Sequence, residues 1–487
     1  MSRVSLSQAL RSLKLAGAPK QHGQPVNRNV STALRPLTQD APPSRVSRGQ
    51  PLLAHLMRRY SSYSDITEQY EQDIALQEHF IPPSFPSKAT GVPADRVVVL
   101  PGSTDNQTYT FGKIWLRDNC QCSKCIHPDT RQRIVDTFSI PWDIKVTNTS
   151  RTQDGVELKW SDGHDSKYSF TWLNLQSKWK RRKDKPRRTL YKLRPYWTYD
   201  PKRNGHPTVK YSDVMSDDES VLHWLQNIYD WGYCFVKDTP VDPESTEALL
   251  KRIAFVRHTH YGGFWDFTAD MTFKDTAYTN ESLGAHTDNT YFTDPARLQL
   301  FHLLSHSDGE GGKSLLVDGF EAARLLFHEN EQHALTLTHA KHTYHASGNP
   351  DTCIQPIDQF PTLRTHPFSE AQLYQIRWNN YDRAVKWNWQ FEDQEAWYKA
   401  ANHFNEIIHR PELENWTQLE PGTALIFDNW RMLHGRSEFT GKRRMCGGYI
   451  NNDDFLSRYR LLKFGREAVL QNIGNPIWSS NNPSCFL

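Results

Sequence analysis

The sequence predicts a mainly β protein of the α+β class, with a small β-rich domain ahead of a larger sandwich or barrel. Three observations favour this class. Strand-like runs recur from about residue 93 onward, no regular βαβ alternation separates them, and three cysteines crowd the segment 120–125. At 487 residues the chain is also longer than one ordinary domain. We therefore expect several folded parts rather than one doubly wound sheet.

The chain divides into five expected parts. They are a leader over 1–60, a linker over 61–92, a small zinc-binding β domain over 93–176, a basic linker over 177–210 and a catalytic domain over 211–487. The small domain is expected from the strand-like runs 96–100, 155–160 and 167–170, which turn residues separate.

The leader has the composition of an organellar address. Residues 1–59 hold ten Lys or Arg and a single acid, Asp40, although the whole chain carries a net charge of only +3. Leu6, Leu10 and Leu13 share one helical face beside basic residues. This pattern predicts a mitochondrial transit peptide and a matrix location; a disordered basic tail and a plastid address are the alternatives.

Composition excludes two classes of protein. No apolar run reaches the ~18–20 residues of a membrane span. The basic run 178–188 has no nucleic-acid recognition motif beside it, and the chain after residue 59 is mildly acidic. We interpret that run as a solvated linker and expect no nucleic-acid partner and no membrane span.

The catalytic domain mixes helical and strand patterns. Helices are expected over 219–230, 243–256 and 392–409, and strands over 297–304, 314–317, 374–378 and 423–427. Because the strands outnumber the helices and do not alternate with them, a sandwich or barrel is favoured.

The cysteine cluster predicts a structural zinc site. Cys120, Cys122 and Cys125 place three thiols within six residues, and a closed zinc site takes four N or S ligands. His127 lies too near the loop, whereas His164 can return from a later strand. Three unrelated buried thiols are the alternative.

A second constellation suits iron. His286 and Asp288 are two residues apart, so in an extended strand they project from the same face. His434 follows 146 residues later. Two imidazoles and one carboxylate form the facial set that binds Fe(II) and leaves positions open. The pattern is weak alone, since a chain with 21 histidines contains such pairs by chance. Arg443 or Arg444, in a probable strand after His434, can pair with the carboxylate of a metal-chelating co-substrate.

These residues carry a family resemblance. His286, Asp288, His434 and the following arginine resemble the Fe(II)/2-oxoglutarate-dependent dioxygenases of the taurine-dioxygenase-like superfamily. The cysteine domain resembles the zinc domain of its carnitine-biosynthesis branch, and the likeness covers about residues 93–465. The stretches that carry it are 115–118, 275–279, 311–320, 376–384, 427–436 and 439–441.

The resemblance implies a distorted double-stranded β-helix (jelly roll) and a division of roles. His286, Asp288 and His434 match the iron ligands, and no catalytic residue is implied beyond them. Arg443, with Arg444 as the alternative, matches the residue that binds 2-oxoglutarate, and Ser314 stands where a threonine often touches that co-substrate. Ascorbate as reductant, O2 as co-substrate, structural zinc and a homodimer are further family expectations.

The implied reaction is 3-hydroxylation of the small molecule trimethyllysine, the first step of carnitine biosynthesis. A trimethylammonium group donates no hydrogen bond, so aromatic faces and a carboxylate must select it. Tyr261, Trp265, Asp275 and Tyr278 are spaced as in the family's aromatic cage, and Asn379 and Asn380 are expected at the substrate's other end. Two alternatives stay open: γ-butyrobetaine dioxygenase, which shares the architecture, and a non-catalytic relative that binds methylated lysine.

Overall fold

The computed structural model describes residues 97–177 except 105, then 205–268, 279–366, 369–386, 390–471 and 473. The predicted leader, the linker over 61–92 and most of the basic linker lie outside the described residues. So do two residues of the expected aromatic cage, Asp275 and Tyr278.

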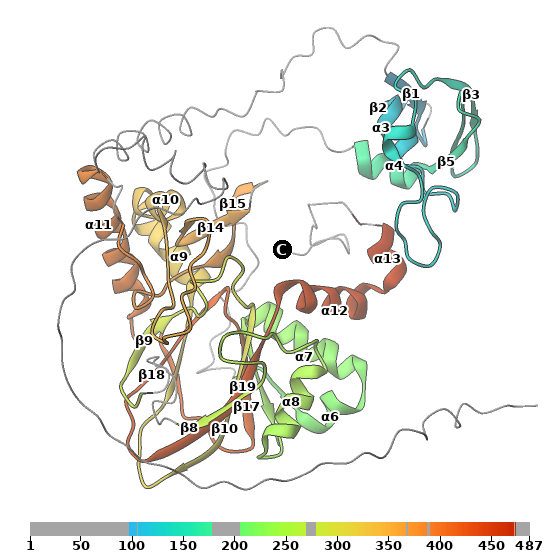
Figure 1. The fold of residues 1–487 in the computed structure, drawn as a ribbon. Coiled ribbons are helices and arrows are strands. Elements are labelled where there is room, and N and C mark those ends of the chain that lie inside the picture. Colours follow the sequence, from blue (N-terminus) through green and yellow to red (C-terminus); the bar gives the residue numbers. More distant parts are fainter. Residues whose placement is uncertain are drawn as a thin grey trace, which may run out of the picture. The chain divides into compact units, whose positions relative to one another are not determined.

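The segment 97–177 is built from two small antiparallel sheets and short helices (Figure 1). Its elements are β1 (Val97–Pro101), β2 (Thr108–Gly112), α3 (Lys113–Asp118), η2 (Thr137–Ser139), β3 (Val146–Arg151), β4 (Gly155–Trp160), β5 (Asp165–Ser169) and α4 (Phe170–Ser177). Exposed and buried residues alternate along β2 and β5, so one face of each sheet turns to a shared core. Leu100, Leu116, Leu158 and Leu173 are fully buried in that core.

The segment from 205 onward contains two larger sheets. The six-stranded sheet has the order β6 (Thr208–Lys210), β7 (Tyr233–Lys237), β17 (Thr423–Asp428), β10 (Leu298–Ser307), β19 (Lys442–Ile450) and β8 (Trp265–Thr268). The four-stranded sheet has the order β16 (Asn415–Thr417), β11 (Ser314–Asp318), β18 (Met432–Arg436) and β9 (Leu283–His286). All neighbouring strands run antiparallel except β6 and β7.

The remaining elements are two strand pairs and two groups of helices (Figure 1). The pairs are β12 (Lys341–His342) with β13 (Phe360–Pro361), and β14 (Leu363–His366) with β15 (Ser369–Ile376). One group of helices comprises α6 (Tyr211–Ser216), α7 (Asp218–Trp231), α8 (Pro243–Lys251), α12 (Asn452–Phe464) and α13 (Arg466–Gln471). The other comprises α9 (Gly319–Glu329), α10 (Glu331–His339) and α11 (Phe391–Ile408).

Strand alternation gives each large sheet an inner and an outer face. Leu425 and Phe427 of β17 pack in one cluster with Leu316 of β11 and Met432 of β18, so this core lies between the two sheets. The residues between them in sequence, such as Ile426, pack outward against helices α7, α8 and α12. On the four-stranded sheet the outward-facing residues of β11 pack against α9, α10 and α11. His286, Ser314, His434 and Arg443, described below, extend from strands of these two sheets and line one pocket.

The expected helices and strands lie close to their predicted positions. Helix α7 begins after Asp217, whose side chain accepts the backbone N–H of Ser220, and it ends at Gly232, where φ is +83°. Helix α8 ends at Lys251, five residues earlier than predicted, and the side chain of Arg252 that follows donates to the carbonyl of Val214. Among the described residues, no helix is both long and apolar enough to cross a bilayer.

Candidate active site

Two histidines face each other on the four-stranded sheet. His286 ends β9 and lies opposite His434 of β18 in the strand register, with ring centroids 4.4 Å apart. The Nδ1 atom of His286 lies 2.8 Å from the carbonyl oxygen of Gly284. A carbonyl only accepts, so Nδ1 carries the hydrogen and Nε2 keeps its lone pair. Nε2 is therefore the atom of His286 that can bind a metal.

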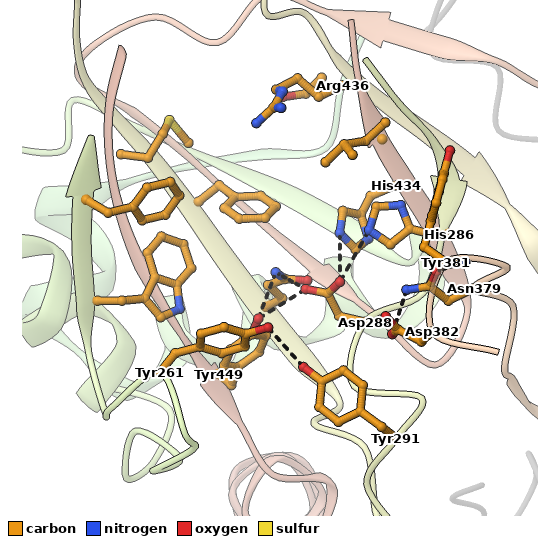
Figure 2. A pocket seen from close by; sticks show the side chains of 18 of the residues that line it. Tyr261, His286, Asp288, Tyr291, Asn379, Tyr381, Asp382, His434, Arg436 and Tyr449 are labelled. Atoms are coloured by element: carbon orange, nitrogen blue, oxygen red, sulfur yellow. Dashed lines mark hydrogen bonds and ion pairs between the residues drawn. The ribbon is translucent and has the colours of Figure 1, made fainter. Parts of the chain in front are cut away.

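Asp288 is held so that one carboxylate oxygen points at both histidines (Figure 2). Its Oδ1 lies 3.3 Å from Nε2 of His286 and 3.7 Å from Nε2 of His434. Its Oδ2 accepts hydrogen bonds from Gln299 (2.7 Å) and from the Tyr449 hydroxyl (3.1 Å). Asn429 fixes the backbone, accepting from the N–H of Asp288 and donating to its carbonyl. Both the carboxylate and the chain that carries it are thus oriented.

The electrostatics of this triad favour a charged carboxylate beside a neutral His434, whereas Asp288 outweighs burial and raises the pKa of His286. Burial disfavours the charged form of Asp288, but the neighbouring His434 and His286 outweigh it, and its pKa lies below the ordinary value. Burial, with His286 nearby, lowers the pKa of His434 to about 3. The ring of His434 packs 4.8 Å from that of Phe427, and its Nδ1 has no hydrogen-bond partner among the described residues. A neutral imidazole and an ionised carboxylate are the forms that bind metals.

The two candidate arginines are neighbours on strand β19 and project from its opposite faces. The side chain of Arg443 is buried, lines the pocket and has an Nε with no partner among the described residues. Burial, and then the charge of Arg436, lower its pKa to about 10. Arg444 lies on the other face, is largely exposed and forms an ion pair with Asp266 at 2.5 Å. Ser314, on the adjacent sheet, lines the same pocket as Arg443.

A second arginine, Arg436, also lines the pocket and was not anticipated from the sequence. It lies two residues after His434 on β18, and its guanidinium donates to the backbone carbonyls of Thr279 and Glu281 at 2.8 Å each. Burial lowers its pKa to about 10. Arg436 and Arg443 give this end of the pocket a positive character.

Of the four residues expected to form the aromatic cage, the structure describes Tyr261 and Trp265. Tyr261 and Trp265 both line the pocket, and the Tyr261 hydroxyl lies 3.2 Å from that of Tyr291 (Figure 2). Asp275 and Tyr278 belong to the part of the chain that is not described. Asn379 lines the pocket, whereas Asn380 is exposed and is not among the lining residues.

The lining residues without a predicted role include Tyr291, Tyr381, Asp382 and Tyr449. Tyr449 had a detectable signal, because it lies six residues after Arg443 in one strand and even spacing places both on the same face. Asp382 lies in the family-like stretch 376–384, but no pattern in the sequence points to a role for it.

The second metal-type cluster lies in the segment 97–177. The Nε2 atom of His164 lies 3.3, 3.6 and 3.5 Å from the Sγ atoms of Cys120, Cys122 and Cys125. Burial and the adjacent thiols raise the pKa of Cys125 to about 12. Arg117 contacts this thiol at 3.5 Å and forms an ion pair with Asp162 at 2.8 Å. The four predicted residues thus meet at one point in the structure.

Comparisons with known proteins identify two matching regions. Residues 191–449 match the family described as "Taurine catabolism dioxygenase TauD, TfdA family", and residues 98–174 match "Gamma-butyrobetaine hydroxylase-like, N-terminal". The first match contains the His286, Asp288 and His434 cluster, and the second contains the cysteine cluster.

Relatives that match about three quarters of the chain indicate the same family. A trimethyllysine dioxygenase of Neurospora crassa is 43% identical over 406 residues, covering 75% of this chain and 85% of the relative. The human mitochondrial trimethyllysine dioxygenase is 37% identical, covering 73% and 84%. A γ-butyrobetaine dioxygenase of a Pseudomonas species is 29% identical, covering 74% and 92%. The chain therefore belongs to the TauD, TfdA dioxygenase family, in the group of the trimethyllysine dioxygenases.

Proposed function

We propose that this dioxygenase hydroxylates N6,N6,N6-trimethyllysine at C3 while 2-oxoglutarate is decarboxylated to succinate and CO2, the first step of carnitine biosynthesis. The observation that carries the proposal is one pocket that unites His286, Asp288 and His434 with the buried guanidinium of Arg443. Relatives at 37–43% identity over most of the chain are named for trimethyllysine, and the γ-butyrobetaine relative is more distant at 29%.

His286, Asp288 and His434 are the groups that would hold Fe(II). Their three ligand atoms lie within 4.8 Å of one another, and two imidazoles with one carboxylate are the set that suits this ion. When bound, iron with O2 and 2-oxoglutarate supplies the oxidising power that places a hydroxyl on an unactivated carbon. The chain contributes orientation: Gln299 and Tyr449 hold the outer oxygen of Asp288 and leave the inner one for the metal.

Arg443 would bind the distal carboxylate of 2-oxoglutarate, with Ser314 beside it. A buried guanidinium loses hydration, and a carboxylate that meets its planar fork restores both charge and hydrogen bonds. The Nε of Arg443 is buried with no partner among the described residues, which supports a bound anion here. Arg444 is unsuited because its guanidinium is already paired with Asp266 on the other face of the sheet.

The trimethylammonium group would lie against aromatic faces. Tyr261 and Trp265 line the pocket with Tyr449 close by, and these rings offer the π surfaces that attract a cation without hydrogen-bond donors. Asp275 and Tyr278 are proposed to complete this cage, on the family resemblance alone. Tyr261 and Tyr449 lie on one side of Asp288 in the view of Figure 2.

Structural zinc is proposed for Cys120, Cys122, Cys125 and His164. In a tetrahedral site with Zn–S of ~2.3 Å and Zn–N of ~2.0–2.1 Å, each S···N edge measures about 3.5 Å. The three S···N distances of 3.3–3.6 Å agree with that value. Such an ion would contribute folding free energy to a small domain.

The rest of the proposal follows the family. It comprises a jelly-roll arrangement of the two large sheets, ascorbate as reductant, a homodimer and a mitochondrial matrix location. The location is supported by the acid-poor leader and by the vertebrate relatives, which are named mitochondrial.

The test incubates protein truncated near residue 60 with Fe(II), 2-oxoglutarate and ascorbate, offering trimethyllysine and γ-butyrobetaine separately. Mass spectrometry measures one added oxygen and an equal amount of succinate. We expect preferential hydroxylation of trimethyllysine, abolished by His286→Ala and retained by His328→Ala, which changes an exposed histidine on α9. Preference for γ-butyrobetaine would overturn the substrate, and tight binding of methylated lysine without turnover would favour the non-catalytic alternative.

A further inference from the structure

The pocket holds a second carboxylate that the proposed reaction has not used. Asp382 lines the pocket and is half-buried. Its Oδ2 accepts hydrogen bonds from the Asn379 side chain at 2.8 Å and from the Thr290 hydroxyl at 3.1 Å. Asn379 is itself fixed, because its Oδ1 accepts the N–H of Tyr381. The carboxylate is therefore held in one orientation at the pocket wall.

Asp382 also lies near the metal-type cluster. Thr290, whose hydroxyl donates to its carboxylate, is two residues after Asp288. In the view of Figure 2 Asp382 lies below His286 and next to Asn379, on the other side of Asp288 from Tyr261 and Tyr449. The rings of Tyr261 and Tyr449 and this carboxylate thus lie on different sides of Asp288 in that view.

Resting on the proposed function, we infer that Asp382 binds the α-ammonium group of trimethyllysine and so determines the preference for an amino-acid substrate. The two cationic groups of trimethyllysine need different partners. The trimethylammonium group has no N–H and suits aromatic faces, whereas the α-ammonium group has three donors and suits a carboxylate. The different positions of the rings and of Asp382 meet these two requirements.

The length of the substrate agrees with this arrangement. Hydroxylation at C3 requires that carbon to lie beside the metal site, and the α-nitrogen is two bonds from C3, about 2.5 Å away. The trimethylammonium nitrogen is four bonds away, about 5 Å in an extended chain. A carboxylate that recognises the α-ammonium must therefore lie close to the iron ligands, as Asp382 does, and the cage must lie further along the pocket.

The same carboxylate would disfavour a substrate that lacks the ammonium. γ-Butyrobetaine has a trimethylammonium group and a carboxylate but no amine. In its complex the substrate would offer no ammonium group to the Asp382 carboxylate, so the favourable charge-assisted contact that trimethyllysine makes would be absent. The discrimination therefore rests on an attraction that only trimethyllysine can use.

The test compares trimethyllysine with 6-(trimethylammonio)hexanoate, which has the same chain and carboxylate but lacks the α-ammonium. The measured quantity is the ratio of kcat/KM for the two substrates, followed by hydroxylated product and succinate. Asp382→Asn keeps the shape and one acceptor oxygen but removes the charge. We expect the ratio to fall about 10- to 100-fold, as for the loss of one charge-assisted hydrogen bond in a water-poor site. Asp213→Asn, an exposed change on α6, should leave the ratio as in the wild type.

Each outcome separates this assignment from the proposed function. If the wild type prefers trimethyllysine and Asp382→Asn lowers kcat/KM for both substrates equally, Asp382 only supports the loop and the assignment is wrong. If the wild type hydroxylates neither compound, the proposed function itself is wrong. Should Asp382→Asn fail to fold, Thr290→Val removes the hydrogen bond from the Thr290 hydroxyl to the carboxylate. The ratio should then fall in the same direction by a smaller factor, and an unchanged ratio would overturn the assignment.

Discussion

Arg443 and Arg444 are adjacent on strand β19, yet they belong to different environments. Arg443 is buried at the wall of the pocket, whereas Arg444 is paired with Asp266 at the surface. The pleat of the strand sends successive side chains to opposite faces, so only one of them can meet a ligand between the sheets. The same substitution made separately at each arginine therefore tests which of the two binds a ligand in the pocket.

We expect Arg443→Met to raise the KM for 2-oxoglutarate at least 10- to 100-fold, because it removes the buried guanidinium from the pocket. Arg444→Met should leave that KM near the wild-type value and cost at most about 1 kcal/mol of stability, as exposed ion pairs do. The measurement is succinate production against 2-oxoglutarate concentration at saturating trimethyllysine. A large effect at Arg444 with none at Arg443 would reverse the assignment.

Gln299 tests whether the groups around Asp288 tune the metal site. Its side-chain amide donates to Oδ2 of Asp288 at 2.7 Å, which leaves Oδ1 facing the histidines. Gln299→Leu keeps the buried volume but lets the carboxylate rotate, so we expect affinity for Fe(II) to fall about 10- to 100-fold. Tyr449→Phe removes the longer of the two hydrogen bonds and should have a smaller effect.

Metal binding can be followed by titration calorimetry with Co(II) under conditions where the thermal midpoint of the metal-free protein is also recorded. A lower affinity with an unchanged midpoint would support an orienting role for Gln299. Unchanged affinity in both variants would mean that Asp288 is held by its backbone contacts to Asn429 alone.

The metal-type clusters were predictable because their residue types are rare and their spacing is short. Cys120, Cys122 and Cys125 are close in sequence, and the two-residue spacing of His286 and Asp288 gives them a common face by local geometry. The four-ligand cysteine cluster and the triad therefore needed only one distant partner each, His164 and His434.

The rest of the pocket depends on tertiary structure. Period-two alternation indicates that Arg443 and Arg444 face opposite ways, but only the pairing of β19 between β10 and β8 decides which one faces inward. Asp382 enters the pocket from the segment after β15, held by Thr290, which lies ninety-two residues earlier in the turn that follows β9. Local periodicity in the sequence cannot predict a contact between residues so far apart in the chain. Asn380 was expected beside substrate, but the turn that fixes Asn379 leaves it exposed.

The cysteine cluster predicts one zinc ion per chain. Purified wild-type protein should contain zinc by elemental analysis, and Cys120→Ser should lose it and unfold the segment 97–177 at lower temperature, because metal binding and folding are coupled. Cys353→Ser is the matched control, since Cys353 is an exposed thiol outside the cluster. Full zinc content in Cys120→Ser would contradict the four-ligand site.

His302 predicts a specific loss of stability in acid. It is fully buried on β10, where Nε2 accepts the N–H of Gly422 and Nδ1 donates to the Thr246 hydroxyl, which itself donates to the carbonyl of Asp242. The ring is thus fixed in its neutral form, and burial lowers its pKa to about 4. In the unfolded chain the pKa is about 6.5. Between these values the unfolded chain binds a proton that the folded chain does not, so stability is complete above pH 6.5 and declines as the pH falls toward 4.

The free energy of unfolding should fall by about 3 kcal/mol because of His302 once the pH lies below both pKa values, which differ by roughly 2.5 units. His302→Gln removes the titrating ring but keeps an amide that can donate and accept, so its free energy of unfolding should change less between pH 7.5 and 4.5. Urea denaturation at several pH values measures both curves. The two proteins should differ most at pH 7.5 and converge as the pH falls. Curves that stay parallel across this range would mean that His302 takes up its proton equally in the folded and unfolded chains, and that its burial does not hold it neutral.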